Sequence, residues 1–147
     1  MLAKSSWQHL IPHRDVMCLL DTVVAFDGER LHAQSDSHRA SDNPLRADGL
    51  LRAVHLAEYG AQAMAVHGGL LAVQRGDAAR PGLLVALRQV HLAVARLDDL
   101  PAPLDVHVEK LLDGGTSWQY AFHIDCAARR LADGRAAVMV GDDGGRS

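Results

Sequence analysis

The chain has 147 residues, of which 48% are hydrophobic and 4% aromatic, and its formal net charge is -3. This length fits one domain with a substantial hydrophobic core, and the apolar share excludes bulk disorder. This small negative net charge gives no indication of a basic surface that would bind nucleic acid or an anionic membrane. No stretch approaches the roughly 20 apolar residues of a membrane span, and the first residues lack the apolar core of a signal peptide. We therefore expect one cytoplasmic domain over residues 1–147, with a polar, Gly-rich tail at 141–147 that frays.

The first third of the chain predicts two strands and a loop. Residues 18–26 are rich in β-branched and apolar side chains and end at the turn signal Asp27-Gly28. Residues 30–37 are expected to pair back as a second strand. The polar segment 37–50 contains Asn43-Pro44 and Asp48-Gly49, which predicts a loop.

Residues 51–74 predict one long helix. The segment is rich in Ala and Leu, has no Pro, and is too long for a typical strand. It is apolar nearly all round, which is typical of a helix buried in a core. Gly68-Gly69 are expected to weaken or end its regular part, and residues 75–82 predict a loop.

The rest of the chain predicts antiparallel strands. Alternation of apolar and polar residues is clearest over 118–126, and the other strands are expected at 83–97, 104–112 and 136–140. Asp113-Gly114-Gly115 and Asp133-Gly134 are the expected turns. The fold class is therefore α+β, an antiparallel sheet curved around one helix, although several α+β topologies satisfy this pattern.

Two motifs resemble a known enzyme family. Ile11-Pro12-His13-Arg14, followed by Leu19-Leu20-Asp21, resembles the opening of FabZ-type 3-hydroxyacyl-carrier-protein dehydratases. Residues 54–65 resemble their central helix, where Glu58 precedes Ala61-Gln62-Ala63. Asn43-Pro44-Leu45 and residues 58–68 resemble more closely the dehydratase-like proteins of aryl-polyene and xanthomonadin-type pigment clusters.

This resemblance implies a hot-dog fold and the dehydration of 3-hydroxyacyl chains on an acyl carrier protein to 2-enoyl thioesters, in fatty-acid or aryl-polyene synthesis. The substrate then arrives on the carrier's phosphopantetheine, and no cofactor is expected. One departure matters. FabZ-type enzymes carry their catalytic histidine in a Gly-His-Phe-Pro loop, which this chain lacks; counted back from Glu58, the matching position is Pro44. The catalytic histidine is therefore not assigned by the resemblance.

Dehydration needs a base for the α-proton, an acid for the departing hydroxyl, and donors to the thioester oxygen. His55 and Glu58 are three residues apart, so they are neighbours on one helix face. We assign His55 as base and Glu58 as acid, with His38 in the preceding loop as the next candidate base. For His55, a satisfied polar position between two subunits' helices is an equally good interpretation.

The expected substrate contacts lie around this pair. Backbone N–H groups at the helix start are the predicted oxyanion donors, and Tyr59 and Gln62 extend the polar stripe. His13, in the family-like opening segment, is expected near the tunnel mouth or an interface. The predicted substrate-binding residues are Gly49, Leu50, Leu51, Tyr59, Gln62 and His13.

The remaining histidines are expected to be structural or solvent-facing: His67 on the helix, and His32, His91, His107 and His123 in strands. We expect no metal site among these histidines. Cys18 and Cys126 lie in apolar runs without metal-ligand spacing and are expected to be buried thiols.

The expected partners are an acyl carrier protein and further hot-dog subunits. Four arginines around the loop and helix start are candidates for contact with the phosphopantetheine phosphate or an acidic carrier: Arg14, Arg39, Arg46 and Arg52. Because hot-dog sheets have edges, we expect a homodimer or larger homo-oligomer, or pairing with a second hot-dog subunit. Two other functions stay open: an acyl thioesterase that activates water, and a non-catalytic partner that binds an acyl chain.

Overall fold

The computed structural model describes residues 1–11, 17–77 and 82–140, so His13, Arg14 and the predicted tail at 141–147 lie outside the described residues. Apart from the short strand β1, which was not expected, its strands and its long helix follow the expected order. They are β1 (Leu2–Ala3), β2 (Thr22–Phe26), β3 (Arg30–Ser35), α1 (Leu56–Gln74), β4 (Gly82–Leu92), β5 (Leu104–Asp113), β6 (Ser117–Cys126) and β7 (Arg129–Val140). Short 3-10 turns cover Lys4–Ser6, Gln8–Leu10, Ser37–Arg39 and Ala53–His55.

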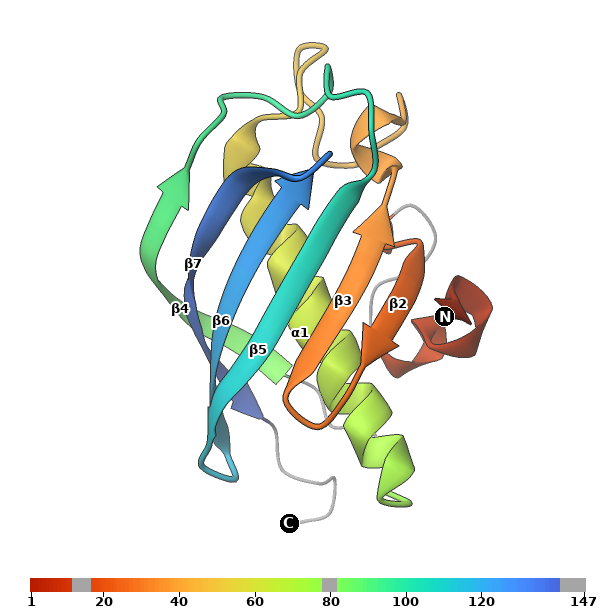
Figure 1. The fold of residues 1–147 in the computed structure, drawn as a ribbon, viewed down its shortest axis with the longest axis vertical. Coiled ribbons are helices and arrows are strands. Elements are labelled where there is room, and N and C mark those ends of the chain that lie inside the picture. Colours follow the sequence, from red (N-terminus) through yellow and green to blue (C-terminus); the bar gives the residue numbers. More distant parts are fainter. Residues whose placement is uncertain (12–16, 78–81, 141–147) are drawn as a thin grey trace.

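The strands form one antiparallel sheet, in which their order is β1-β2-β3-β5-β6-β7-β4. The sheet curves over α1, which runs behind it in Figure 1. This is the hot-dog arrangement expected from the sequence. β4 directly follows the helix in the chain and lies at one end of the strand order, so one of its edges has no neighbour within the described sheet.

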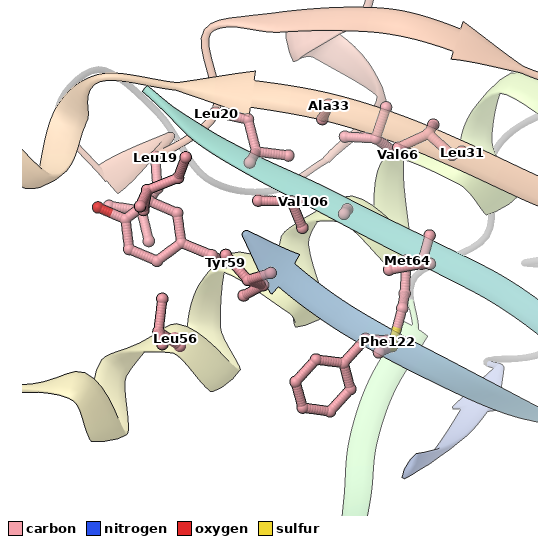
Figure 2. Packing of buried hydrophobic residues seen from close by; sticks show 14 of the residues in the cluster. Leu19, Leu20, Leu31, Ala33, Leu56, Tyr59, Met64, Val66, Val106 and Phe122 are labelled. Atoms are coloured by element: carbon pink, nitrogen blue, oxygen red, sulfur yellow. The ribbon is translucent and has the colours of Figure 1, made fainter. Parts of the chain in front are cut away.

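The core fills the space between α1 and the inner face of the sheet (Figure 2). Alternate residues of β5 and β6 are buried there, including Val106 and Phe122, because successive side chains of a strand point to opposite faces. Tyr59 and Met64 meet them from the helix, and both are buried. The alternation that predicted the strand at 118–126 is therefore the packing pattern of its buried face.

The turn predicted at Asp133-Gly134 is wrong. β7 runs straight through both residues, and the turn between β6 and β7 lies at Ala127 and Ala128, whose φ angles are 51° and 67°. Gly134 has a packing role instead: a Cβ there would lie 3.0 Å from Cε1 of Phe122. The glycine leaves room for a buried ring rather than for a chain reversal.

The helix also differs from its prediction at both glycines. α1 continues past Gly68 and Gly69 to Gln74. A Cβ at Gly68 would lie 2.7 Å from Cζ3 of Trp118, and one at Gly69 would lie 2.9 Å from Cβ of Leu10. Close packing against these two side chains explains why the helix tolerates a residue pair of low helix propensity.

His67 is a buried structural residue, as expected. Its Nε2–H donates to the carbonyl oxygen of Asp27 (2.8 Å), so its Nδ1 accepts from the hydroxyl of Tyr120 (2.9 Å). Burial lowers the pKa of His67 below its ordinary 6.5, and the charge of Lys110 adds to this, whereas the bond to Asp27 opposes it. The neutral imidazole is therefore the form that the fold holds.

We expect the free energy of unfolding to fall as the pH drops below about 6.5, the ordinary histidine pKa. The unfolded chain binds a proton there that buried His67 resists, so acid favours unfolding, with a slope of at most about 1.4 kcal/mol per pH unit for one proton. Urea titrations between neutral and mildly acidic pH measure this slope. His67→Gln should reduce it and exposed His9→Gln should not; equal slopes in both variants would rule out His67 as the source.

Cys18 and Cys126 are buried and form no disulfide, which confirms their predicted state. Within the described ranges, no helix has the length and hydrophobicity needed to cross a membrane.

Candidate active site at the start of the central helix

One face of α1 is left uncovered by the sheet. Val54 is 61% exposed, Glu58 is also exposed, and Ala61 and Ala65 are half-buried. Spacings of three and four residues place these side chains in one stripe along the helix. The chain's own core therefore occupies only part of the helix surface, and the stripe that contains the predicted acid remains open.

His55 and Glu58 lie at the N-terminal end of this helix. His55 ends a 3-10 turn that continues directly into α1, and its side chain is half-buried. Among the described residues, neither side chain has a hydrogen bond or an ion pair. Both are therefore accessible to a ligand, unlike the polar groups that fold the surrounding loops.

Backbone pairing fixes the helix start beside the segment that follows β4. The amide of Ala53 donates to the carbonyl oxygen of Ala95 (3.0 Å), and the amide of Leu97 donates to that of Leu51 (2.8 Å). The carboxylate of Asp98 accepts a hydrogen bond from the amide of Leu51 (2.9 Å). A hydrogen bond from Arg96, together with the one from Leu51, holds the pKa of the Asp98 carboxyl well below its usual range. These bonds hold the start of the helix next to the segment that follows the edge strand β4, at the upper left of Figure 1.

The sequence did not single out Asp98, which anchors this junction. Its only signal was its place in the charged run from Arg96 to Asp99, which is typical of any surface loop. The structure gives the carboxylate a specific partner because the loop after β4 folds back over the helix start.

Two of the three predicted oxyanion donors are already engaged. The amide of Leu51 donates to Asp98, and that of Leu50 donates to the carbonyl oxygen of Ala47 (2.9 Å). Neither N–H is available to a substrate in this arrangement. Within the described residues the amide of Gly49 has no acceptor, and its φ of 74° turns the chain just before the helix. Gly49 is thus the remaining donor of the three.

Tyr59 and Gln62 do not lie on the uncovered stripe. The hydroxyl of Tyr59 bonds with Oγ of Ser37 (2.8 Å) and accepts from Nδ2 of Asn43 (3.2 Å), and burial raises the pKa of Tyr59. Figure 2 shows its ring beneath Leu19 and Leu20. This network fastens the loop before the helix onto α1.

Gln62 plays the equivalent part for the N-terminal segment. Its Oε1 accepts from the amide of Leu19 (2.8 Å), and its Nε2 donates to the carbonyl oxygen of Met17 (2.7 Å). Because both ends of the buried amide are satisfied by backbone, Gln62 is structural here, and the predicted polar stripe reduces to His55 and Glu58.

His38 is enclosed rather than open. Its side chain is fully buried, and its Nε2–H donates to the carbonyl oxygen of Leu100 (3.1 Å). Its Nδ1 has no partner in the described part of the chain. Burial lowers the pKa of His38, so the ring is neutral, but a substrate would reach it only if the loop moved. Accessibility favours His55 over His38.

The loop arginines are also partly engaged. Arg46 donates to three loop carbonyl oxygens, those of Ala40, Gly49 and His38. Arg39 pairs with Asp36 and donates to the carbonyl oxygen of Pro101. Arg52, in contrast, is exposed beside the helix start.

Comparison with known proteins gives one family and one fold. The family model described as ApeP-like, ApeP dehydratase, matches residues 5–146. No curated protein sequence matches the chain. Among solved structures, a chain of the dehydratase heterocomplex ApeI:P from Xenorhabdus doucetiae has a TM-score of 0.83 and 25% sequence identity; the match covers 92% of this chain and 90% of that one.

More distant structures share the fold alone. The conserved protein PA5202 from Pseudomonas aeruginosa has a TM-score of 0.63 at 14% identity, with 91% of this chain and 98% of that one covered. A hypothetical thioesterase protein from Streptococcus pneumoniae, solved with coenzyme A, has a TM-score of 0.59 at 15% identity, with 86% and 90% covered.

Proposed function

The chain belongs to the ApeP-like dehydratase family, and we propose that it dehydrates 3-hydroxyacyl chains carried on the phosphopantetheine of an acyl carrier protein, in aryl-polyene-type synthesis. The observation that carries this proposal is the position of Glu58. It lies accessible on the first turn of the central helix, three residues after His55, whereas the buried polar side chains Tyr59, Gln62 and His67 of the same helix are hydrogen-bonded within the fold.

The proposed reaction uses these two side chains. His55 takes the proton from the α-carbon, and the electrons of that C–H bond form the new double bond between the α- and β-carbons. The β-carbon–oxygen bond breaks, and Glu58 gives its proton to the departing hydroxyl, which leaves as water. The amide of Gly49 is the proposed donor to the thioester oxygen, where negative charge develops. His38 is kept as the second candidate base. The chemistry needs no further cofactor.

We propose that a second hot-dog subunit completes the site. The helix start that carries Glu58 is bonded to the segment that follows β4, and the β4 side chains Leu87, Val90 and Leu92 are 41%, 38% and 44% exposed. An edge strand with exposed apolar residues is prone to pair with another strand. A partner joined there would also cover the helix stripe and exclude water from Glu58. The ApeI:P relative, a heterocomplex, supports such pairing.

The carrier protein is proposed to approach at the loop end of the helix. Exposed Arg52 stands there, next to Gly49, and a guanidinium suits both the phosphate of phosphopantetheine and an acidic carrier surface. Acyl carrier proteins work in the cytoplasm, which is where we place the reaction.

The product distinguishes the three candidate functions. The purified chain, alone and with a co-expressed hot-dog subunit, is incubated with a 3-hydroxyacyl-loaded carrier protein, and the carrier is analysed by mass spectrometry. Dehydration predicts loss of one water from the carrier-bound chain. Free carrier thiol without an enoyl intermediate would identify a thioesterase instead. If the chain alone never dehydrates the substrate, and the activity of the complex depends only on residues of the partner subunit, the chain is a non-catalytic subunit.

The proposed interface is tested in the same assay with Leu87→Glu. A charge on the exposed edge of β4 should both reduce assembly, measured by light scattering after size exclusion, and lower dehydration in parallel. Leu112→Glu is the matched control, since Leu112 is 62% exposed at the far end of β5. Full activity of a monomeric Leu87→Glu variant would contradict a shared site.

A further inference from the structure

The outer face of the sheet carries three histidines in a row. His32, His107 and His123 are direct partners across the neighbouring strands β3, β5 and β6. Their rings stack, with centroid separations of 4.1 Å between His32 and His107 and 4.5 Å between His107 and His123. Directly opposed residues on one face of an antiparallel sheet are close enough to bind the same small ligand.

Carboxylates lie at both ends of this row. Asp105 accepts a hydrogen bond from Nε2 of His32 (2.8 Å). At the other end, Oδ2 of Asp125 lies 3.8 Å from Nε2 of His123. The histidines open into a hollow of about 720 Å³ on this face. An ion can therefore enter from solvent without any opening of the core.

We propose that His107, His123 and Asp125 form a binding site for a zinc-like divalent ion on the outer face of the sheet. Each offers one donor atom, and the three atoms lie within 4.8 Å of one another. Imidazole nitrogen and carboxylate oxygen are ligands that zinc prefers. Zinc–nitrogen bonds of about 2.0–2.1 Å need donor atoms roughly 3.3 Å apart, so binding draws these side chains together by rotation about their χ angles.

The surroundings favour the ligating form of both histidines. Burial lowers the pKa of His107, and the charges of His32 and His123 act in the same direction, whereas Asp125 and Asp105 oppose the shift. Burial and the charge of Arg130 lower the pKa of His123, and Asp125 and Asp133 oppose this shift. Neutral imidazoles present lone pairs to an ion without first losing a proton. Arg130 also bonds to Oδ1 of Asp125 (2.7 Å), which leaves the second carboxylate oxygen toward His123.

This site is separate from the proposed active site. Side chains alternate along β5 and β6, so the inner neighbours of these histidines, such as Val106 and Phe122, are buried against the core. The histidines point to the opposite face from α1. An ion bound here would join β5 to β6, and it would stabilise the fold by an amount that grows with the logarithm of the free ion concentration above the Kd.

Isothermal titration calorimetry of the tag-free chain with zinc chloride tests the proposal, with magnesium chloride as the ion control. We expect saturable binding of one zinc ion and a raised melting temperature, with no response to magnesium. His107→Gln, His123→Gln and Asp125→Asn should each weaken zinc binding at least about tenfold. His91→Gln is the matched control, since His91 lines the same hollow and pairs with Asp133.

The proposal is overturned if zinc gives no saturable heat, or if His91→Gln weakens binding as much as the three ligand variants do. Asp125→Asn is the variant least expected to misfold, because asparagine keeps the shape of the side chain and its Oδ1 can still accept the hydrogen bond from Arg130. An unaltered melting temperature without zinc would show that the Asp125→Asn protein is folded. If its zinc affinity were then also unchanged, Asp125 would not be a ligand.

Discussion

Glu58→Gln is expected to lower the rate of dehydration by about 100-fold to 10,000-fold, the range over which positioned acid–base groups contribute to catalysis. Glutamine keeps the shape of the side chain but has no carboxyl proton to give to the departing hydroxyl. Because the Glu58 side chain is exposed and makes no hydrogen bond within the described residues, the free energy of unfolding should stay unchanged. Carrier mass spectrometry measures the rate, and a urea titration measures the stability.

Glu29→Gln provides the matched control for this variant. Glu29 is exposed in the β2–β3 turn, far along the chain from the helix, so the same loss of charge should leave both rate and stability intact. Normal turnover by Glu58→Gln would contradict the assignment of Glu58 as the acid. If the variant instead loses the release of free carrier thiol, and dehydration is unaffected, Glu58 acts in a thioesterase reaction.

Phe122→Ala is expected to have the largest effect on stability, a loss of about 3–5 kcal/mol. The ring is 3% exposed and fills the space between the helix and β7. A Cβ at Gly60 would lie 3.3 Å from its Cδ2, and one at Gly134 would lie 3.0 Å from its Cε1. Both backbones are therefore held against this ring, and removing it leaves a cavity that the flanking glycines cannot fill.

Urea unfolding followed by circular dichroism measures this loss. Leu112→Ala removes a similar apolar side chain from an exposed position on β5 and should change stability by no more than about 0.5 kcal/mol. If the two variants unfold at the same urea concentration, the packing between Gly60 and Gly134 contributes little. The loss is large relative to the total of about 5–15 kcal/mol typical of a domain, so partial unfolding of the variant is expected.

The pattern of the chain predicted the architecture because each of its signals is local. Alternation over 118–126 indicates a half-buried strand whatever the strand's neighbours are, and it became β6. The apolar segment 51–74 predicted the central helix, which begins a few residues later, at Leu56. The first residues of the predicted segment pair with the loop after β4 instead of joining the helix, as in the hydrogen bond from the amide of Ala53 to the carbonyl oxygen of Ala95. A tertiary contact therefore set this boundary.

The glycines show where local signals failed. Asp133-Gly134 and Gly68-Gly69 carry the composition of a turn and of a helix end, yet both pairs lie inside regular elements. What they provide is space, for Phe122 and Val90 in one case and for Trp118 and Leu10 in the other. Such a role depends on which side chain lies opposite in the fold, and a single sequence does not contain that information in any periodic form.

The sequence by itself indicated the order of the strands and the central helix, and its family resemblance predicted the hot-dog fold and led to the proposal of Glu58, since these depend on residue type, spacing and motif. Tertiary structure alone decided that Tyr59 and Gln62 are anchors, that His38 is enclosed, and that His107 and His123 meet Asp125. The physical reason is register. Residues far apart in the chain become neighbours only when strand pairing and helix packing are fixed, and a polar side chain's role is set by the partners that this arrangement brings to it.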